Sequence, residues 1–227
     1  MTTKEALLKK LKNKEAHIAV LGLGYVGLPL AVVFGNAGFN VIGIDPDARK
    51  VGSLNNGISY IPDVPTANVA RLVQNGKLTA TTDFSALKDV DAVSICVPTP
   101  LRKTGDPDMS YIDAATSELA KYVHAGMVVV LESTTYPGTT REVILPMLTE
   151  KSGLTVGEDL FLCFSPNALT PVVKTGRQST RRRFWAASPQ VARKRRTLGT
   201  VARFRRLCRS LRQKLPRCRN CLRTPSA

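Results

Sequence analysis

A glycine-rich turn between two apolar segments constrains the fold of this chain more than any other feature. The segment His17-Ile-Ala-Val-Leu-Gly22 is short and apolar, and residues 25–37 form an apolar segment of helical length. The turn between them reads Gly22-Leu-Gly24-Tyr-Val-Gly27. A second apolar run, Asn40-Val-Ile-Gly-Ile-Asp45, ends in an acid 18 residues after Gly27. This order predicts a strand, a tight turn, a helix and a second strand, which together begin a βαβ unit.

Short apolar runs and segments of helical length continue to alternate as far as residue 164. They predict strands at 78–81, 92–97, 127–131 and 160–164, and helices at 47–56, 66–75, 110–124 and 139–151. Ser110 is the expected N-cap of the third of these helices. Leu7, Leu8 and Leu11 predict an amphipathic helix at the N-terminus. Apolar strands joined by helices imply a parallel sheet covered on both faces. The expected fold class is therefore α/β, a Rossmann-type doubly wound parallel sheet.

The three glycines have different expected tasks in a dinucleotide site. Gly22 allows the tight turn, Gly24 lets the backbone approach a pyrophosphate, and Gly27 lets the helix and strand pack closely. The N-terminus of the following helix adds free N–H groups and a partial positive charge for the phosphates. The alternative is a sheet of the same type in which the glycines serve packing alone.

Asp45 is the expected recognition group for the adenosine ribose. A carboxylate at the end of the second strand accepts hydrogen bonds from the ribose hydroxyls and repels a 2′-phosphate, which favours NAD over NADP. Arg49 and Lys50 follow closely and leave NADP open as an alternative.

Two later strands end in polar residues at the same expected edge of the sheet. Residues 92–97 run into Pro98-Thr99-Pro100, and residues 127–131 run into Glu132-Ser133-Thr134-Thr135. Ligands of open α/β sheets bind at the carboxyl ends of the strands. These side chains are therefore placed either to contact a nicotinamide ribose or to cap the turns that follow.

Net charge divides the chain after Pro166. Residues 1–166 carry 15 Lys and Arg against 17 Asp and Glu, a net −2, whereas residues 167–227 carry 18 Lys and Arg and no acid, a net +18. A segment with so little apolar periodicity and no opposite charge cannot offset its ordering entropy by burial. We therefore expect an NAD-binding Rossmann domain at 1–166 and a disordered, Arg-rich basic C-terminal tail at 167–227.

Composition also excludes several classes of protein. No run approaches the ~20 apolar residues of a membrane helix, and the N-terminus lacks the apolar core of a secretory signal. Five cysteines without an export signal argue against a disulfide scaffold. Cys218-Arg-Asn-Cys221 with Cys208 falls short of the four ligands of a structural zinc site, so no metal site is expected. The sequence predicts a soluble cytoplasmic protein without a membrane partner.

Further motifs accompany the glycine turn in a fixed order over residues 15–166. They are Gly22-Leu-Gly-Tyr-Val-Gly-Leu-Pro-Leu-Ala31, Gly43-Ile-Asp45, Cys96-Val-Pro-Thr-Pro-Leu101, Leu131-Glu-Ser-Thr-Thr-Tyr-Pro-Gly-Thr-Thr140 and Phe164-Ser-Pro166. Together they resemble the nucleotide-sugar 6-dehydrogenases of the UDP-glucose/GDP-mannose dehydrogenase family. Within that family they look most like the enzymes that oxidise UDP-N-acetylglucosamine or UDP-N-acetylmannosamine.

The resemblance implies an oxidoreductase of polysaccharide biosynthesis. Such enzymes oxidise the C6 alcohol of a UDP-sugar, here a UDP-N-acetylhexosamine, to a carboxylate and reduce two NAD. The cofactor-binding residues that it implies, together with the glycines assigned above, are Gly22, Gly24, Tyr25, Val26, Gly27, Asp45, Lys50, Thr99 and Thr134.

The catalytic part of the family pattern is missing from this sequence. Family enzymes follow Phe-Ser-Pro with a glutamate that assists hydrolysis, then with a dimer-forming helix and a UDP-binding domain that supplies a cysteine in a Gly-Gly-x-Cys setting. Asn167 stands in place of the glutamate, and none of the five cysteines has that setting. The resemblance therefore assigns no catalytic residue, and we expect a half-enzyme that binds NAD and does not turn over alone.

The abrupt end of the family pattern fits a shifted reading frame. Residues 167–176 read Asn-Ala-Leu-Thr-Pro-Val-Val-Lys-Thr-Gly, and one allowed coding is AAC GCG TTG ACC CCG GTC GTG AAG ACT GG. A single G placed in front turns this coding into Glu-Arg-Val-Asp-Pro-Gly-Arg-Glu-Asp-Trp, which is the continuation that the family resemblance implies. Loss of one nucleotide near codon 167, in the gene or in its sequencing, also explains the arginine-rich composition of the tail.

The basic tail allows a different function. Arg181-Arg-Arg183 and Arg193-Lys-Arg-Arg196 are basic patches of the kind that bind phosphates. A polycation of this length binds nucleic acid without sequence preference and with steep salt dependence. The alternative is thus a Rossmann domain fused to a functional nucleic-acid-binding tail, although we expect no specific nucleic-acid partner.

The reading-frame hypothesis makes a direct prediction about the coding DNA. Insertion of one base at codon 167 will open a frame that encodes the ten residues above and continues without an early stop. Re-sequencing of the genomic locus checks this prediction. If none of the possible single-base insertions restores an open, family-like frame, the hypothesis is wrong.

Overall fold

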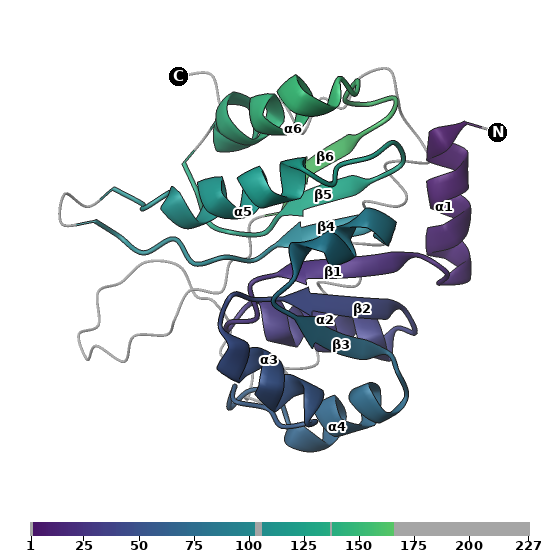
Figure 1. Cartoon of the computed structure of the whole chain (residues 1–227), viewed down its shortest axis with the longest axis vertical. Coiled ribbons are helices and arrows are strands. Elements are labelled where there is room, and N and C mark those ends of the chain that lie inside the picture. The colour runs from purple at the N-terminus through teal and green to yellow at the C-terminus, as the bar shows by residue number, and fades with distance from the viewer. Residues whose placement is uncertain (1, 103–105, 137, 166–227) are drawn as a thin grey trace, which may run out of the picture.

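A single parallel sheet organises the molecule. The computed structural model describes residues 2–102, 106–136 and 138–165, and its six strands lie in the order β3-β2-β1-β4-β5-β6 (Figure 1). The order reverses between β1 and β4, as in other doubly wound folds. This confirms the predicted Rossmann-type α/β fold. The strands are β1 (His17–Leu21), β2 (Asn40–Ile44), β3 (Leu78–Thr81), β4 (Ala92–Ile95), β5 (Val128–Leu131) and β6 (Phe161–Phe164).

Helices cover both faces of the sheet. One buried cluster joins one face to α1, α2, α3 and α4, and a second joins the other face to α5 and α6. The central strands β4 and β5 are buried along their whole length, which is why they read as continuous apolar runs. The helices are α1 (Thr3–Asn13), α2 (Gly27–Asn36), α3 (Ala48–Asn55), α4 (Thr66–Gln74), α5 (Ser110–Ala120) and α6 (Leu145–Ser152).

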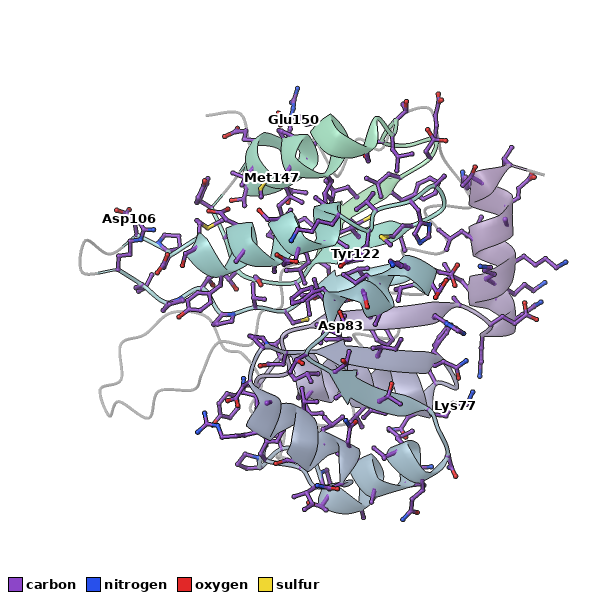
Figure 2. All side chains as sticks on the ribbon, viewed as in Figure 1. Lys77, Asp83, Asp106, Tyr122, Met147 and Glu150 are labelled. Carbon is purple, nitrogen blue, oxygen red and sulfur yellow. The ribbon has the colours of Figure 1, made fainter. Side chains whose placement is uncertain are left out.

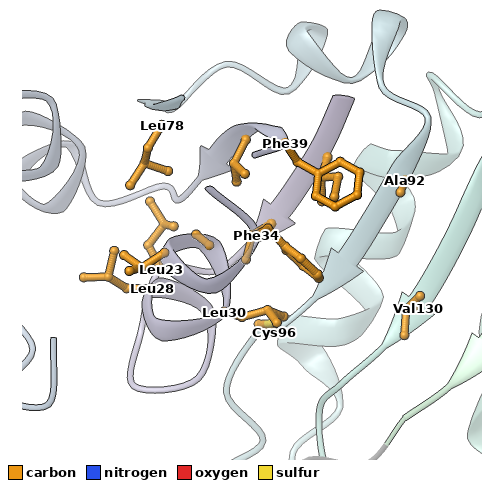
Figure 3. Close-up of a cluster of buried hydrophobic side chains, with 14 of the residues drawn as sticks. Leu23, Leu28, Leu30, Phe34, Phe39, Leu78, Ala92, Cys96 and Val130 are labelled. Atoms are coloured by element: carbon orange, nitrogen blue, oxygen red, sulfur yellow. The ribbon is translucent and has the colours of Figure 1, made fainter. Parts of the chain in front are cut away.

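Helix α2 is the packing centre of the first cluster. Its Leu28, Leu30 and Phe34 are buried in a cluster that also contains residues of all six strands and of the turn before the helix (Figure 3). Because α2 is apolar on nearly all sides, it can lie between the sheet and its neighbouring helix α4. The core therefore fixes the position of the segment that follows the glycine turn.

The expected N-cap of α5 is wrong. Ser110 is the first residue of the helix, Met109 occupies the cap position, and neither side chain caps the first turn. The carboxylate of Asp108 takes that task, because its Oδ1 accepts a hydrogen bond from the Ser110 N–H at 3.1 Å. This bond, together with the Arg102 guanidinium, holds the pKa of Asp108 below its usual range.

The expected helix at 110–124 ends early, at Ala120. The residues after it turn back toward the sheet, where His124 bridges two carbonyl oxygens. Its Nδ1 lies 3.1 Å from the carbonyl oxygen of Ala125, and its Nε2 lies 3.1 Å from that of Val90. A ring N–H that donates to either of these oxygens holds the chain on a path that a continued helix would leave.

The expected helix at 139–151 is in fact two elements. A π-helical turn, η2 (Thr140–Ile144), precedes α6, and Pro146 stands in the first turn of α6. Proline has no N–H to donate to the carbonyl four residues earlier, so the hydrogen-bond register changes at this point. The pattern also missed a 3-10 helix, η1 (Phe84–Asp89), which begins where the Asp83 carboxylate accepts from the Ser85 N–H.

Asn55 at the end of α3 covers the outer edge of β3. Its amide nitrogen donates to the carbonyl oxygen of Ala80 at 2.9 Å, and its amide oxygen accepts from the Ala80 N–H at 2.8 Å. Both backbone groups of Ala80 that face away from β2 are therefore satisfied.

Asp91 ties the N-terminal helix to the start of the sheet. Its Oδ1 pairs with the Lys10 ammonium at 2.7 Å, and its Oδ2 accepts from the His17 N–H at 3.0 Å. The backbone of Asp91 completes the junction, because its N–H donates to the His17 carbonyl oxygen. Leu7 and Leu11 of α1 are buried in the first cluster, so both polar and apolar contacts hold this helix.

The segment between β4 and α5 extends away from the sheet as a two-stranded arm. Leu101 and Pro107 form an antiparallel bridge, and the Arg102 N–H donates to the Asp106 carbonyl oxygen at 2.7 Å. Figure 2 shows Asp106 at a distance from the helices and strands. No helix in the described ranges is both long and apolar enough to cross a membrane. The predicted disorder of residues 167–227 concerns residues that lie outside those ranges.

We predict that Asp91→Ala destabilises the fold by about 1–3 kcal/mol, because it leaves the His17 N–H and the Lys10 ammonium without their acceptor. Asp89→Ala, an exposed carboxylate two residues away, is the control and should change the free energy of unfolding by less than about 0.5 kcal/mol. Urea denaturation of both variants measures the difference. If Asp91→Ala lowers the free energy of unfolding no more than the Asp89→Ala control does, the Asp91 junction adds no stability.

Candidate functional site

The first glycine of the turn packs against the backbone after β4, and the third lets α2 approach β1 at backbone distance. Gly22 has a φ of +87°, and a Cβ on it would lie 2.9 Å from the carbonyl oxygen of Cys96. A Cβ on Gly27 would lie only 1.7 Å from the carbonyl oxygen of Gly22. Any side chain at Gly27 therefore separates the helix from the strand.

The second glycine faces open space. A Cβ on Gly24 would meet no heavy atom within 4 Å, and its φ is not in the left-handed region. Nothing in the described part of the chain thus requires glycine at this position. The hydrogen bonds of α2 start with Leu28, whose N–H donates to the Gly24 carbonyl oxygen at 3.1 Å. The N–H groups of Tyr25, Val26 and Gly27 precede that pattern and point out of the helix end, where an anion binds most favourably.

Asp45 lies directly beside the turn and binds it. Asp45 is 3% exposed, and its Oδ2 accepts a hydrogen bond from the Leu23 N–H at 2.8 Å. Its Oδ1 accepts from the Asp47 N–H at 3.0 Å. An ionised carboxylate has about four acceptor positions, so these two backbone bonds fix the group and still leave capacity for other donors. The sequence predicted a ribose acceptor here, and the structure adds a bond to the turn itself.

Arg49 and Lys50, the two basic residues that kept NADP binding as an alternative, are each paired with a carboxylate. The Lys50 ammonium lies 3.1 Å and 3.4 Å from the two oxygens of Asp45. The Arg49 guanidinium makes two 3.0 Å bonds with Asp47 and lowers the pKa of that acid. Lys50 has further N–H donors for ribose oxygens beside the carboxylate. Since both positive charges are balanced locally, neither forms an isolated basic site for a 2′-phosphate.

Hydroxyl groups join the loops that follow β4 and β5. The Ser133 hydroxyl donates to the Val97 carbonyl oxygen at 2.7 Å, and the Thr99 hydroxyl donates to the Thr134 carbonyl oxygen at 2.9 Å. These bonds run between neighbouring loops, so neither side chain caps its own turn. The Thr134 side chain is exposed at the same edge. The loops that hold Thr99 and Thr134 therefore form one connected border of the site.

The expected cofactor residues gather along the carboxyl edge of β2, β1, β4 and β5. The Gly22 N–H donates to the Ile44 carbonyl oxygen at 2.8 Å, one residue before Asp45. Gly22 also lies against the backbone of Cys96 and Val97, two residues before Thr99. Tyr25, at 73% exposure, stands at the outer end of the turn. The edge so formed crosses the point between β1 and β4 where strand order reverses, which is where such sheets bind ligands.

The cysteines in the described ranges do not form a nucleophilic site. Cys96 and Cys163 are both buried and both free. Burial, with a smaller contribution from the charge of Glu132, raises the pKa of Cys96 well above its usual value. A protonated, buried thiol is a poor nucleophile.

Sequence reasoning missed one residue at this edge, Tyr60. Its hydroxyl donates a hydrogen bond to the Leu23 carbonyl oxygen, inside the glycine turn, at 2.8 Å. Tyr60 is a lone aromatic residue in a loop 37 positions away, and no spacing or motif in the sequence connects it with the turn.

Comparison with known proteins supplies the family. The model of the UDP-glucose/GDP-mannose dehydrogenase family, NAD binding domain, matches residues 16–175. UDP-N-acetyl-D-glucosamine 6-dehydrogenase of Pseudomonas aeruginosa is 35% identical over 180 residues, which cover 79% of this chain and 42% of that enzyme. UDP-N-acetyl-D-mannosamine dehydrogenase of Pyrococcus horikoshii is 36% identical and is matched over 68% of this chain and 37% of its own length.

A solved structure agrees with these relatives. NDP-N-acetyl-D-galactosaminuronic acid dehydrogenase of Methanosarcina mazei superposes with a TM-score of 0.67 at 36% identity, over 75% of this chain and 38% of that one. The chain thus spans about two fifths of the length of the relatives that it matches. The matched stretch contains the glycine turn, Asp45 and the border of Thr99 and Thr134. The chain belongs to the UDP-glucose/GDP-mannose dehydrogenase family, and residues 16–175 match that family's NAD-binding domain.

Proposed function

We propose that this chain is the cofactor-binding half of a dehydrogenase that oxidises the C6 alcohol of a UDP-N-acetylhexosamine to a carboxylate. The names of the Pseudomonas and Pyrococcus relatives support this substrate class. The oxidation removes four electrons from the sugar, and NAD supplies the acceptor for each of the two hydrides. The task of the chain is to bind and orient that cofactor.

The open space at Gly24 is the observation that carries the cofactor part of this proposal. It lies beside the free N–H groups of Tyr25 and Val26, and no packing within the described ranges requires it. A pyrophosphate needs such a place, because its oxygens must approach backbone N–H groups without meeting a side chain. Asp45 and Lys50 then stand at the ribose end, with Thr99 and Thr134 toward the nicotinamide end.

We also propose that this chain does not catalyse the oxidation alone. Cys96 and Cys163 are buried in the sheet, and neither has the Gly-Gly-x-Cys setting that the resemblance implies for the catalytic cysteine. Within the described ranges, the edge where the expected cofactor residues gather has no exposed thiol. Turnover then requires the groups that the rest of a family enzyme provides.

The Gly24 site can be tested with two matched substitutions. Gly24→Ala should weaken NADH binding by on the order of tenfold or more, because a methyl group enters the pyrophosphate space. Gly52→Ala is the control, since a Cβ there also meets nothing within 4 Å but lies on the exposed side of α3. Calorimetric titration with NADH measures both, and thermal melting verifies that both variants stay folded. Unchanged affinity in folded Gly24→Ala contradicts the assignment.

If this chain is only the cofactor-binding half of the enzyme, it should bind NADH without oxidising a UDP-sugar. The purified chain should bind NADH but produce none from NAD and either UDP-N-acetylglucosamine or UDP-N-acetylmannosamine, as followed by absorbance. A version that carries the one-base insertion at codon 167 should gain activity and form two NADH per sugar. Turnover by the present chain that disappears in Cys96→Ser or Cys163→Ser would overturn the proposed inactivity.

A further inference from the structure

Tyr60 lies outside the expected cofactor set and yet contacts its centre. It belongs to the loop between α3 and α4, is half-buried, and donates its hydroxyl hydrogen to the Leu23 carbonyl oxygen at 2.8 Å. Burial, followed by the charges of Asp45 and Asp47, raises the pKa of Tyr60. The phenol is therefore protonated, and remains a donor, throughout the pH range in which proteins function.

Leu23 is fixed from three directions. Its side chain is fully buried and lies over Gly43, where an added Cβ would be 2.6 Å from a Leu23 methyl carbon. Its N–H donates to Asp45, and its carbonyl oxygen accepts from Tyr60. The side chain and the N–H do not determine how the following peptide group is rotated. The hydroxyl of Tyr60 determines this rotation, because it donates a hydrogen bond to the carbonyl oxygen of that peptide group.

The orientation of this peptide decides what the turn presents to a phosphate. The peptide bond is planar and trans, so the Gly24 N–H points opposite to the Leu23 carbonyl. With the carbonyl held by Tyr60, the N–H points away from Tyr60. If the peptide rotated by half a turn, the negative end of the carbonyl would replace the N–H, and an anion would be repelled there.

We propose that Tyr60 is a positioning residue of the cofactor site, which acts through Leu23 to orient the Leu23–Gly24 peptide toward the pyrophosphate of NAD. Tyr60 itself does not touch the phosphates. The proposal rests on the NAD-binding role of the domain and adds a residue from a loop that the glycine motif does not include. It also links the α3–α4 loop to the affinity of the site.

The loop has other anchors, so the hydroxyl can be removed without loss of the loop. Ile61 and Val64 are buried in the first cluster, and the Val64 N–H donates to the Ile61 carbonyl oxygen at 2.9 Å. The Ser59 hydroxyl bonds the backbone of Ile61. Tyr60→Phe keeps the ring and deletes only the bond to Leu23.

The test compares Tyr60→Phe with Tyr111→Phe, an exposed tyrosine on α5, in the full chain. NADH and ADP-ribose, which both contain the pyrophosphate, should bind Tyr60→Phe about fivefold to tenfold more weakly, the loss expected for one hydrogen bond. Adenosine, which has no phosphate, should compete with NADH in both variants as it does in the parent chain. An equal loss for adenosine, or a loss that follows a lower melting temperature, would mean that Tyr60 has only a structural role.

A second measurement needs no cofactor. In ¹⁵N-labelled protein, the amide resonance of Gly24 should shift in Tyr60→Phe and stay in place in Tyr111→Phe. A Gly24 resonance that stays in place, or NADH affinity retained within about twofold, overturns the role of Tyr60 alone. Failure of the parent chain to bind NADH is a different result, because it refutes the cofactor function on which the proposal rests.

Discussion

The contact between the backbones of β1 and α2 is the constraint on which the rest of the cofactor domain depends. The Gly22 carbonyl oxygen lies where a side chain at Gly27 would begin. Because α2 starts so close to β1, the free N–H groups at its N-terminus lie at the carboxyl edge of the sheet. The buried leucines and Phe34 of α2 hold this geometry from the other end. Packing requires glycine at Gly22 and Gly27. At Gly24 the described residues leave open space, and we propose that the ligand requires it.

Asp45 joins the ribose site that we propose to the shape of the glycine turn. A buried carboxylate needs compensation for lost hydration, and Asp45 is only 3% exposed. It obtains this from two backbone N–H groups and from Lys50. One of those N–H groups belongs to Leu23, so the side chain that we propose as the ribose acceptor also holds the glycine turn. Replacement of Asp45 should therefore disturb both the proposed ribose site and the turn.

The sequence predicted most of the fold because its signals are local. Apolar runs, glycines and their spacing placed all six strands within two residues of their observed bounds. The errors occur where a distant or competing group decides. Asp108, rather than Ser110, supplies the acceptor at the start of α5, and Pro146 changes the register of the expected helix at 139–151. Tyr60 was beyond prediction, because a single hydroxyl in a loop gives no pattern until the chain brings it to Leu23.

The amide of Asn55 has a consequence for how the domain behaves among its own copies. A terminal β-strand with unpaired backbone groups is a template on which another chain can add a strand. At β3 the outward N–H and carbonyl of Ala80 are already bonded to Asn55. A second molecule would have to displace a two-bond contact before it could extend the sheet there. One side chain at the end of α3 thus opposes aggregation at this border, at no cost to the cofactor edge.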